Sequence, residues 1–484
     1  MLQSLRTASG SPLLPALASR AALLVVVLAA AFAAGAAVAI GFWQVAVAAA
    51  VAIPFSAAVA RSPFAVLLAW LLVVPYVIQQ LTVDIHPLVW TLHRLGVPAL
   101  LVLMIVYHTL GIRRSPFRLR AYDAALVLFL VAGVINILVL APNPIRMLGA
   151  FYDQLAVPIA FFWLVRAIGP DRSDLNRLVL VGAWTIVVQA TIGIVSWIAP
   201  SILPAQWLGR AGERTVGTFG GPAPYTITLV FCALLVLFAA LSSRNPRTRL
   251  LLFGIVVAAQ LGVVLSLSRG SWLGGGMAML GIVVVYRREI GRFAIAAALL
   301  ALVLVLGPVG DLASVAQERL VAGDTVEARI ITNDASTRMI LDKPLAGFGY
   351  GNFERFDEGY KQRVGDIPLI LGGSAHNTYL NLLAELGIPA TLLYLSPPIV
   401  LLALTFRLWL RRRRLPQVDW RFITILWLAI VDQFVVNNFL EIIHFSFWAT
   451  SLWWLTLGLL AVGLQRLPGH ELTRSGSAPP APSW

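Results

Sequence analysis

The chain contains one cysteine, Cys232, in 484 residues, and only 12% of its side chains are charged. A single cysteine excludes an intramolecular disulfide and a cysteine-rich metal site. The six histidines do not follow the spacing of metal ligands, so we expect neither a structural zinc nor another bound metal. Soluble domains carry about 25% charged residues, and the deficit here argues against a soluble protein.

Apolar residues are abundant instead, at 59% of the chain. Apolar runs of about 17 residues or more are long enough to cross a bilayer. They predict an all-α integral membrane protein with about 12 to 14 transmembrane helices. The predicted spans are 20–41, 43–60, 62–80, 94–112, 122–141, 147–168, 176–199, 217–242, 249–267, 271–286, 292–308, 388–410, 422–438 and 444–465. We interpret the first run as an uncleaved anchor, because the chain behind it is itself membrane-embedded.

The net charge of +14 would indicate a nucleic-acid partner in a soluble protein. Here we expect no nucleic acid, because short cytoplasmic loops of membrane proteins are also rich in Lys and Arg. If the N-terminus lies inside, every strongly basic short loop falls on the cytoplasmic side, which predicts two cytoplasmic termini. These loops contain Arg61, Arg113, Arg114, Arg118, Arg120, Arg172, Arg177, Arg244, Arg247, Arg249, Arg287, Arg288, Arg292 and the run 411–414.

The same map predicts one large outer loop and five regions in all. They are a cytoplasmic N-terminus (1–19), a transmembrane bundle (20–310), the large loop (311–387), C-terminal transmembrane helices (388–465) and a cytoplasmic tail (466–484). The polar part of the loop, 311–375, holds ten of the 22 acidic residues. It is too long for a connector, so we expect a small helical cap over the outer face. The tail is rich in Pro, Ser and Ala and is predicted to be disordered.

Arg269 interrupts apolar residues between two predicted spans at the outer surface. An arginine that faces lipid costs a few kcal/mol, so we expect it to face a watery cavity or an anion. Gly270 beside it permits a tight turn that exposes backbone N–H groups, which suits a phosphate oxygen. The alternative is an interfacial arginine that extends to lipid headgroups.

A second basic segment, with Arg210 and Arg214, precedes the glycine-rich stretch 217–222 at the outer start of a predicted span. Glycines allow close contact with a ligand, and the helix N-terminus behind them favours negative charge. The segment therefore predicts anion binding, and the alternative is a flexible loop before a helix.

In the outer loop, Arg329 and Arg338 lie on a predicted helix that should end at Pro344. Arg329 shares a face with Asn333 and Thr337, and we consider it a candidate ligand for an anion. Arg338 can pair with Asp334 at i,i+4, so a solvated salt bridge is its alternative.

Three glycines alternate with aromatic residues in the stretch 347–353, which includes Gly349 and Tyr350. This pattern indicates a turn shaped for a ligand or for close packing. It does not match a nucleotide-binding fingerprint, because no strand pattern precedes it.

His376 and Asn377 begin a predicted short amphipathic helix that returns to the membrane. Nearby arginines would favour the neutral form of His376, which suits a general base or hydrogen-bond donor near neutral pH. The alternative is a histidine that only caps or packs. Glu441 and His444 also lie at the outer face and are second-tier candidates.

These residues together resemble the O-antigen ligase and O-antigen polymerase superfamily of bacterial membrane glycosyltransferases. The resemblance rests on Ser268-Arg269-Gly270, Gly217-Thr218-Phe219, Arg329, Gly347-Phe348-Gly349, His376 to Leu380 and Glu385-Leu386-Gly387, and covers about residues 210–390. It implies a GT-C-like fold in the bacterial inner membrane with the active site at the periplasmic face. It also implies a donor glycan on undecaprenyl diphosphate, and a lipid A-core or another glycan as acceptor.

By this resemblance, His376 would act on the acceptor hydroxyl, and Arg214, Arg269 and Arg329 would hold the diphosphate, with Arg338 a weaker candidate. No cofactor, metal or nucleotide is implied. Fixed guanidinium groups could stabilise the charge that develops on the leaving diphosphate, and attack on the far face of the anomeric carbon would invert it. We favour a ligase over a polymerase. A transporter is the competing class, but its polar groups usually lie at mid-membrane, whereas these gather at one face.

Overall fold

The computed structural model describes residues 55–77, 90–209, 214–306, 324–365, 367, 376–415 and 418–465, and these are helical with no β-strand among them. Their elements are α3 (Pro63–Val77), η2 (Trp90–Leu95), α5 (Gly96–Thr109), α6 (Ala121–Leu140), α7 (Pro144–Phe151), η3 (Tyr152–Ala156), α8 (Val157–Ile168), α9 (Arg172–Ile198), η4 (Pro200–Ile202), η5 (Ala205–Trp207), α10 (Pro222–Ser242), α11 (Pro246–Leu265), α12 (Arg269–Leu306), α14 (Asp324–Asp342), α15 (Phe353–Phe356), η7 (Asp357–Gly359), α16 (Thr378–Leu410), η8 (Arg412–Arg414), α17 (Trp420–Phe439), α18 (Ile442–Phe445) and α19 (Phe447–Gln465). The predicted all-α membrane class is confirmed.

Within the described residues, eight helices are long and apolar enough to cross a membrane. They coincide with eight predicted spans, from 122–141 to 249–267 and from 388–410 to 444–465. Most of these helices begin after a residue whose side chain accepts a hydrogen bond from a backbone N–H of the first turn. In α9, Asp171 accepts from the backbone N–H of Asp174, 2.9 Å away, and Asp419 accepts in the same way from Phe422 at the start of α17.

The remaining predicted spans differ from the structure or lie outside the described residues. The runs 271–286 and 292–308 correspond to two helices that meet at a kink at Tyr286, without a loop between them, and that share the label α12, which ends at Leu306. The basic stretch between them contains no proline, and Arg and Glu are good helix formers, so only a kink results. The span 62–80 is one arm of a pair bent by 118°, and 94–112 yields only the short α5. The first span, 20–41, lies outside the described residues, as does most of 43–60.

The helix α16 is kinked at Gly387, where φ is +79°. The predicted short helix after His376 and the predicted span 388–410 are therefore two helices that meet at this kink and share the label α16. Pro389 cannot donate to the carbonyl of Glu385, and the N–H of Ile388 donates to Pro344 instead, at 2.8 Å. The kink thus leaves carbonyl groups of α16 open to partners from the outer loop.

The core lies around α10 and α19, since 83% of the residues in an apolar 18-residue stretch of each helix are buried. Trp448 of α19 stacks on Trp70 of α3, with ring centroids 5.1 Å apart. A buried ion pair joins α6 to α8, because Arg166 donates to both carboxylate oxygens of Asp123. The guanidinium of Arg166 also lies 4.5 Å from the ring centroid of Phe117. Removal of either partner would leave the other as an unpaired buried charge, which would destabilise the fold.

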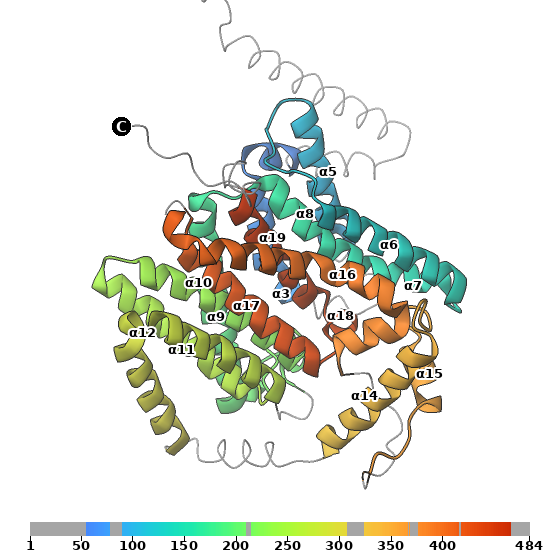
Figure 1. Ribbon diagram of the computed structural model, residues 1–484. Helices are drawn as coiled ribbons and strands as arrows, with labels where there is room; N and C mark the ends of the chain where they lie inside the picture. Colours follow the sequence, from blue (N-terminus) through green and yellow to red (C-terminus); the bar gives the residue numbers. More distant parts are fainter. Residues whose placement is uncertain are drawn as a thin grey trace, which may run out of the picture.

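The described part of the large loop is helical, as predicted. Its helices α14 and α15 pack at the beginning of α16, at the lower right of Figure 1. α14 ends at Asp342, two residues before Pro344, where the sequence predicted its end. The loop therefore contributes a helical cap at one end of the bundle.

Candidate active site

Two helices, α10 and α12, begin side by side. The hydroxyl of Thr226 in α10 donates to that of Ser271 in α12 at 2.6 Å, and both residues are buried. Ser271 in turn donates to Ser268, at 3.0 Å. Since helix N-termini carry partial positive charge and unpaired N–H groups, their convergence favours an anion.

A third helix, α16, begins at the same place. Gly270 lies so close to α17 that a Cβ atom on it would come 2.9 Å from the Cβ atom of Phe439. The neighbour of Phe439, Leu440, accepts through its carbonyl from the hydroxyl of Thr378, the first residue of α16, at 2.9 Å. The predicted segments around Arg269 and His376, more than a hundred residues apart in sequence, therefore meet at the end of α17.

The segment of Arg214 is tied to the same end of the bundle. The N–H of Thr215 donates to the carbonyl of Leu265, at 3.3 Å, where α11 ends. The hydroxyl of Thr215 accepts a hydrogen bond from the indole N–H of Trp197 in α9, at 2.9 Å. These bonds bring Arg214 beside the turn that carries Arg269. Arg210, predicted with Arg214, lies outside the described residues.

The glycine-rich stretch after Arg214 is closely packed, which argues against a flexible loop. Gln189, fully buried in α9, accepts from the N–H of Thr218 at 3.2 Å and donates to its hydroxyl at 2.8 Å. Gly217 has φ of +55°, and a Cβ atom there would lie 2.4 Å from Oε1 of Gln189. This glycine serves close packing against α9, and that packing positions the arginine before it.

Two residues other than glycine have positive φ within the described chain, Leu267 and His376, both at 48°. Such a backbone costs on the order of 1–3 kcal/mol and persists only where the surroundings enforce it. Leu267 lies two residues before Arg269, and His376 is itself a candidate. The strained backbone therefore coincides with the two segments that the sequence selected.

Arg329, on α14 of the cap, faces the other two arginines. Burial lowers the pKa of Arg329, and the charges of Arg269 and Arg214 lower it further. All three side chains are half-buried. Three guanidinium groups from separate segments thus lie close enough for their charges to repel one another, and an anion bound among them would offset this repulsion. Guanidinium groups suit the paired oxygens of phosphate.

His376 lies beside this group of arginines. Burial lowers its pKa, the charge of Arg329 lowers it further, and Glu441 acts in the opposite direction. The imidazole is therefore neutral at neutral pH, as a general base must be before it accepts a proton. We refer to Arg214, Arg269, Arg329 and His376 as the arginine–histidine site.

Two predicted residues near this site have structural partners. The carboxamide oxygen of Asn377 caps α16 by accepting from the N–H groups of Tyr379 and Leu380, at 3.0 and 3.1 Å. Arg338 is exposed and donates to Asp334 at 2.8 Å, which is the solvated pair weighed as its alternative. A ligand-binding role for either residue stays a prediction.

Gly349 and Tyr350 are buried in the turn 347–353, and the structure favours close packing over ligand contact for this turn. The N–H groups of Phe348 and Gly349 donate at 2.9 Å to the carbonyls of Ala384 and Glu385, which the kink of α16 leaves open. The hydroxyl of Tyr350 donates to Gln154 at 2.6 Å. A contact of either residue with the substrate stays a prediction.

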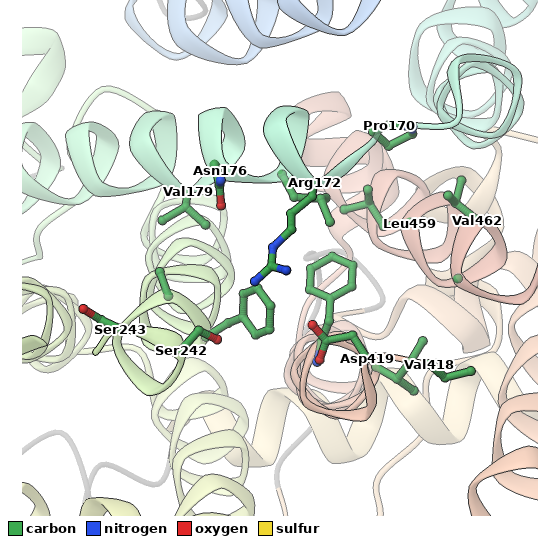
Figure 2. A pocket seen from close by; sticks show the side chains of 16 residues that line it. Pro170, Arg172, Asn176, Val179, Ser242, Ser243, Val418, Asp419, Leu459 and Val462 are labelled. Atoms are coloured by element: carbon green, nitrogen blue, oxygen red, sulfur yellow. The ribbon is translucent and has the colours of Figure 1, made fainter. Parts of the chain in front are cut away.

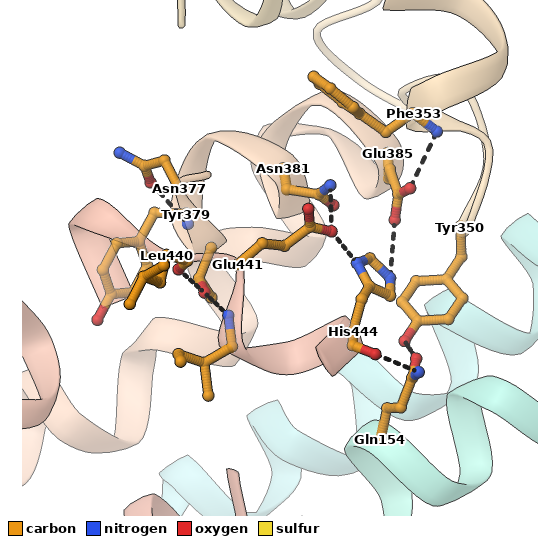
Figure 3. Close-up of polar contacts among 12 residues, drawn as sticks. Gln154, Tyr350, Phe353, Asn377, Tyr379, Asn381, Glu385, Leu440, Glu441 and His444 are labelled. Atoms are coloured by element: carbon orange, nitrogen blue, oxygen red, sulfur yellow. Dashed lines mark hydrogen bonds and ion pairs between the residues drawn. The ribbon is translucent and has the colours of Figure 1, made fainter. Parts of the chain in front are cut away.

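A second polar cluster lies next to the arginine–histidine site (Figure 3). His444 bonds through Nδ1 to Glu441, and its Nε2 lies 3.4 Å from Oε2 of Glu385. Asn381 donates to Glu441 at 2.7 Å. Burial lowers the pKa of His444, but Glu385 and Glu441 outweigh it and raise the pKa to about 9. His444 is thus a half-buried imidazolium, in contrast to His376.

Sequence reasoning missed the polar residues of the spans that support these loops. Asn136 of α6 donates to the carbonyl of Ala346 and accepts from the N–H of Tyr350, at 2.7 and 3.0 Å. Gln154, in the π-helical turn η3, donates to the carbonyl of His444 at 3.0 Å. An isolated amide within an apolar run was the available signal, since buried polar groups in membrane helices need partners.

A cavity of about 460 Å³ lies at the other end of the bundle (Figure 2). Arg172 of α9 points into it, opposite Asp419 at the start of α17. Its walls also include Ser242 and Gly463, where α10 and α19 end. None of the predicted site residues lines this cavity.

Comparison with known proteins identifies one protein family. Residues 254–395 match the sequence model of the O-antigen ligase family. The matched region includes Arg269, Arg329 and His376, whereas Arg214 precedes it and Glu441 follows it. A search among curated proteins finds no match. The resemblance drawn from the sequence is therefore confirmed over residues 254–395, the part of this membrane protein that is similar to the O-antigen ligase family.

Proposed function

We propose that the protein transfers a glycan from undecaprenyl diphosphate to a lipid A-core or related acceptor, at the periplasmic face of a bacterial inner membrane. The observation that carries this proposal is the arginine–histidine site. Three guanidinium groups from three segments meet beside a histidine whose neutral form is favoured. A diphosphate joined to a sugar carries the negative charge that the guanidinium groups would bind. It also contains the anomeric C–O bond that the transfer would break.

The reaction follows from the groups present. His376 takes the proton of the acceptor hydroxyl, whose oxygen attacks the anomeric carbon. The bond from that carbon to the diphosphate oxygen breaks, and its electron pair leaves with the diphosphate. Arg214, Arg269 and Arg329 stabilise the added negative charge, and attack from the opposite face inverts the anomeric carbon.

The test is a reconstituted assay with purified protein, an undecaprenyl-diphosphate glycan and lipid A-core, with metal chelated. We expect glycan on the core and free carrier in equal amounts. Elongation of glycan on the carrier would instead identify a polymerase with the same site. If no acceptor receives glycan, the transfer function is wrong.

Substitutions assign the roles. His376→Ala should lower the transfer rate by about 10²–10⁴-fold, the usual contribution of a general base. Arg269→Lys should lower it by about 10²-fold, because an ammonium cannot form the paired hydrogen bonds of a guanidinium. Arg355→Lys, an exposed residue of the cap, is the matched control. Wild-type rates in either site variant would remove that residue from the mechanism.

A further inference from the structure

The segment 440–442 connects the arginine–histidine site to the second polar cluster. The hydroxyl of Thr378 donates to the carbonyl of Leu440 and accepts from the N–H of Ile442, both at 2.9 Å. Thr378 follows His376 by two residues. The backbone on both sides of Glu441 is therefore held against the first turn of α16, next to His376.

The carboxylate of Glu441 is oriented by two partners, of which Asn381 is buried and His444 half-buried. Asn381, one turn after Asn377 in α16, donates to Oε1 at 2.7 Å. The same oxygen bonds to Nδ1 of His444. Glu441 itself is 5% exposed, so solvent does little to screen its charge.

His444 is in turn held from its other side. Its ring lies 4.9 Å from that of Tyr350, Glu385 faces Nε2, and Gln154 donates to its backbone carbonyl. Figure 3 shows the imidazole between the two carboxyl groups. Although carboxylates and imidazole can bind metals, no group of three such side chains is arranged for one among the described residues.

We propose that Glu441, oriented by His444 and Asn381, is a positioning residue for the proton transfer at His376, because its carboxylate stabilises the imidazolium that His376 becomes. This inference rests on the proposed function. The acceptor O–H bond breaks and an N–H bond forms on His376, whose new positive charge is repelled by Arg329 on α14. Glu441, on the segment after α17, supplies the opposing negative charge. When the diphosphate has left, the proton passes from His376 to solvent.

The first test needs no substrate. Diethyl pyrocarbonate acylates an imidazole only in its neutral form, so the pH dependence of its reaction with His376, located by mass spectrometry, reports the ionisation of this residue. In Glu441→Gln, the midpoint should move to lower pH, because a charge that stabilises the imidazolium is lost. Glu441→Asp keeps the charge and should stay near wild type. Glu358→Gln, an exposed carboxylate of the cap, is the control and should not move the midpoint.

The second test uses the transfer assay. Glu441→Gln should lower kcat by about tenfold and move the acidic limb of the rate profile to lower pH, without raising KM for the lipid donor. An unchanged midpoint and limb, with kcat and KM both impaired, would overturn the proposal and leave Glu441 a structural residue. If wild type transfers no glycan but the midpoint still shifts, the proposed function fails while the electrostatic coupling stands.

Discussion

Arg329 and Glu441 act on His376 with opposite sign. The guanidinium disfavours the imidazolium and the carboxylate favours it, and burial adds to the effect of the guanidinium. A base placed between opposite charges can remain neutral before the reaction and still accept a proton during it. The balance at His376 is therefore a property of three residues from three segments.

Arg329→Gln tests this balance from the cationic side. Removing the guanidinium removes a repulsion, so the pKa of His376 should rise and its modification midpoint should move to higher pH, opposite to Glu441→Gln. The imidazole of His376 would then stay protonated up to a higher pH, so less of the neutral base would be available at a given pH. Arg338→Gln, on the same helix but paired with Asp334, should leave the midpoint in place. If both variants kept the wild-type midpoint, the result would contradict the electrostatic effect of Arg329 on His376.

Arg214 and Arg269 could be found from the sequence because a charged side chain at the end of an apolar run is costly and therefore informative, whereas Arg329 and His376 were selected within the outer loop. The supporting residues could not be found. Asn136 and Gln154 bind partners 214 and 196 residues away in sequence. Nothing local distinguishes such an amide from one that only bonds within its own helix.

At the scale of elements, the kink of α16 joins the cap to the bundle. The turn 347–353 supplies N–H groups to the carbonyls of Ala384 and Glu385 that Pro389 and the kink leave unpaired. The sequence predicted a short helix and a separate span on either side of this kink. That a turn from another segment completes the hydrogen bonds between them depends on tertiary contacts that no local pattern encodes.

Gly347→Ala should break this junction. Gly347 has φ of +64°, and a Cβ atom there would lie 2.4 Å from the carbonyl oxygen of Glu385. We expect a loss of about 1–3 kcal/mol in the free energy of unfolding, from backbone strain and lost hydrogen bonds. The thermal unfolding midpoint in detergent measures this loss. Gly359→Ala is the matched control, since no atom lies within 4 Å of the added Cβ atom. Equal midpoints for the two variants would show that the turn does not stabilise the fold.

At the scale of the whole molecule, the basic loops and the arginine–histidine site lie at opposite ends of the bundle. The cavity in Figure 2 is lined by the start of α9 and the end of α10, and it belongs to the basic end. The lengths of apolar runs were sufficient to predict eight of the spanning helices. They were not sufficient for α12, whose basic interruption is compatible with a loop and equally with a helix.

This separation yields a prediction of topology that uses the single native cysteine. The sequence has one cysteine, the buried Cys232, so Cys232→Ala provides a background without thiols. In that background, Glu358→Cys places an exposed thiol in the cap, and Arg244→Cys places one in the short basic loop between α10 and α11. A membrane-impermeant maleimide applied to spheroplasts should label the first and not the second, and permeabilisation should make both reactive. Because both positions are exposed, unequal labelling in intact spheroplasts reports the side of the membrane. Labelling of the loop thiol alone would invert the orientation and place the arginine–histidine site in the cytoplasm, where an outward-facing glycan donor could not reach it.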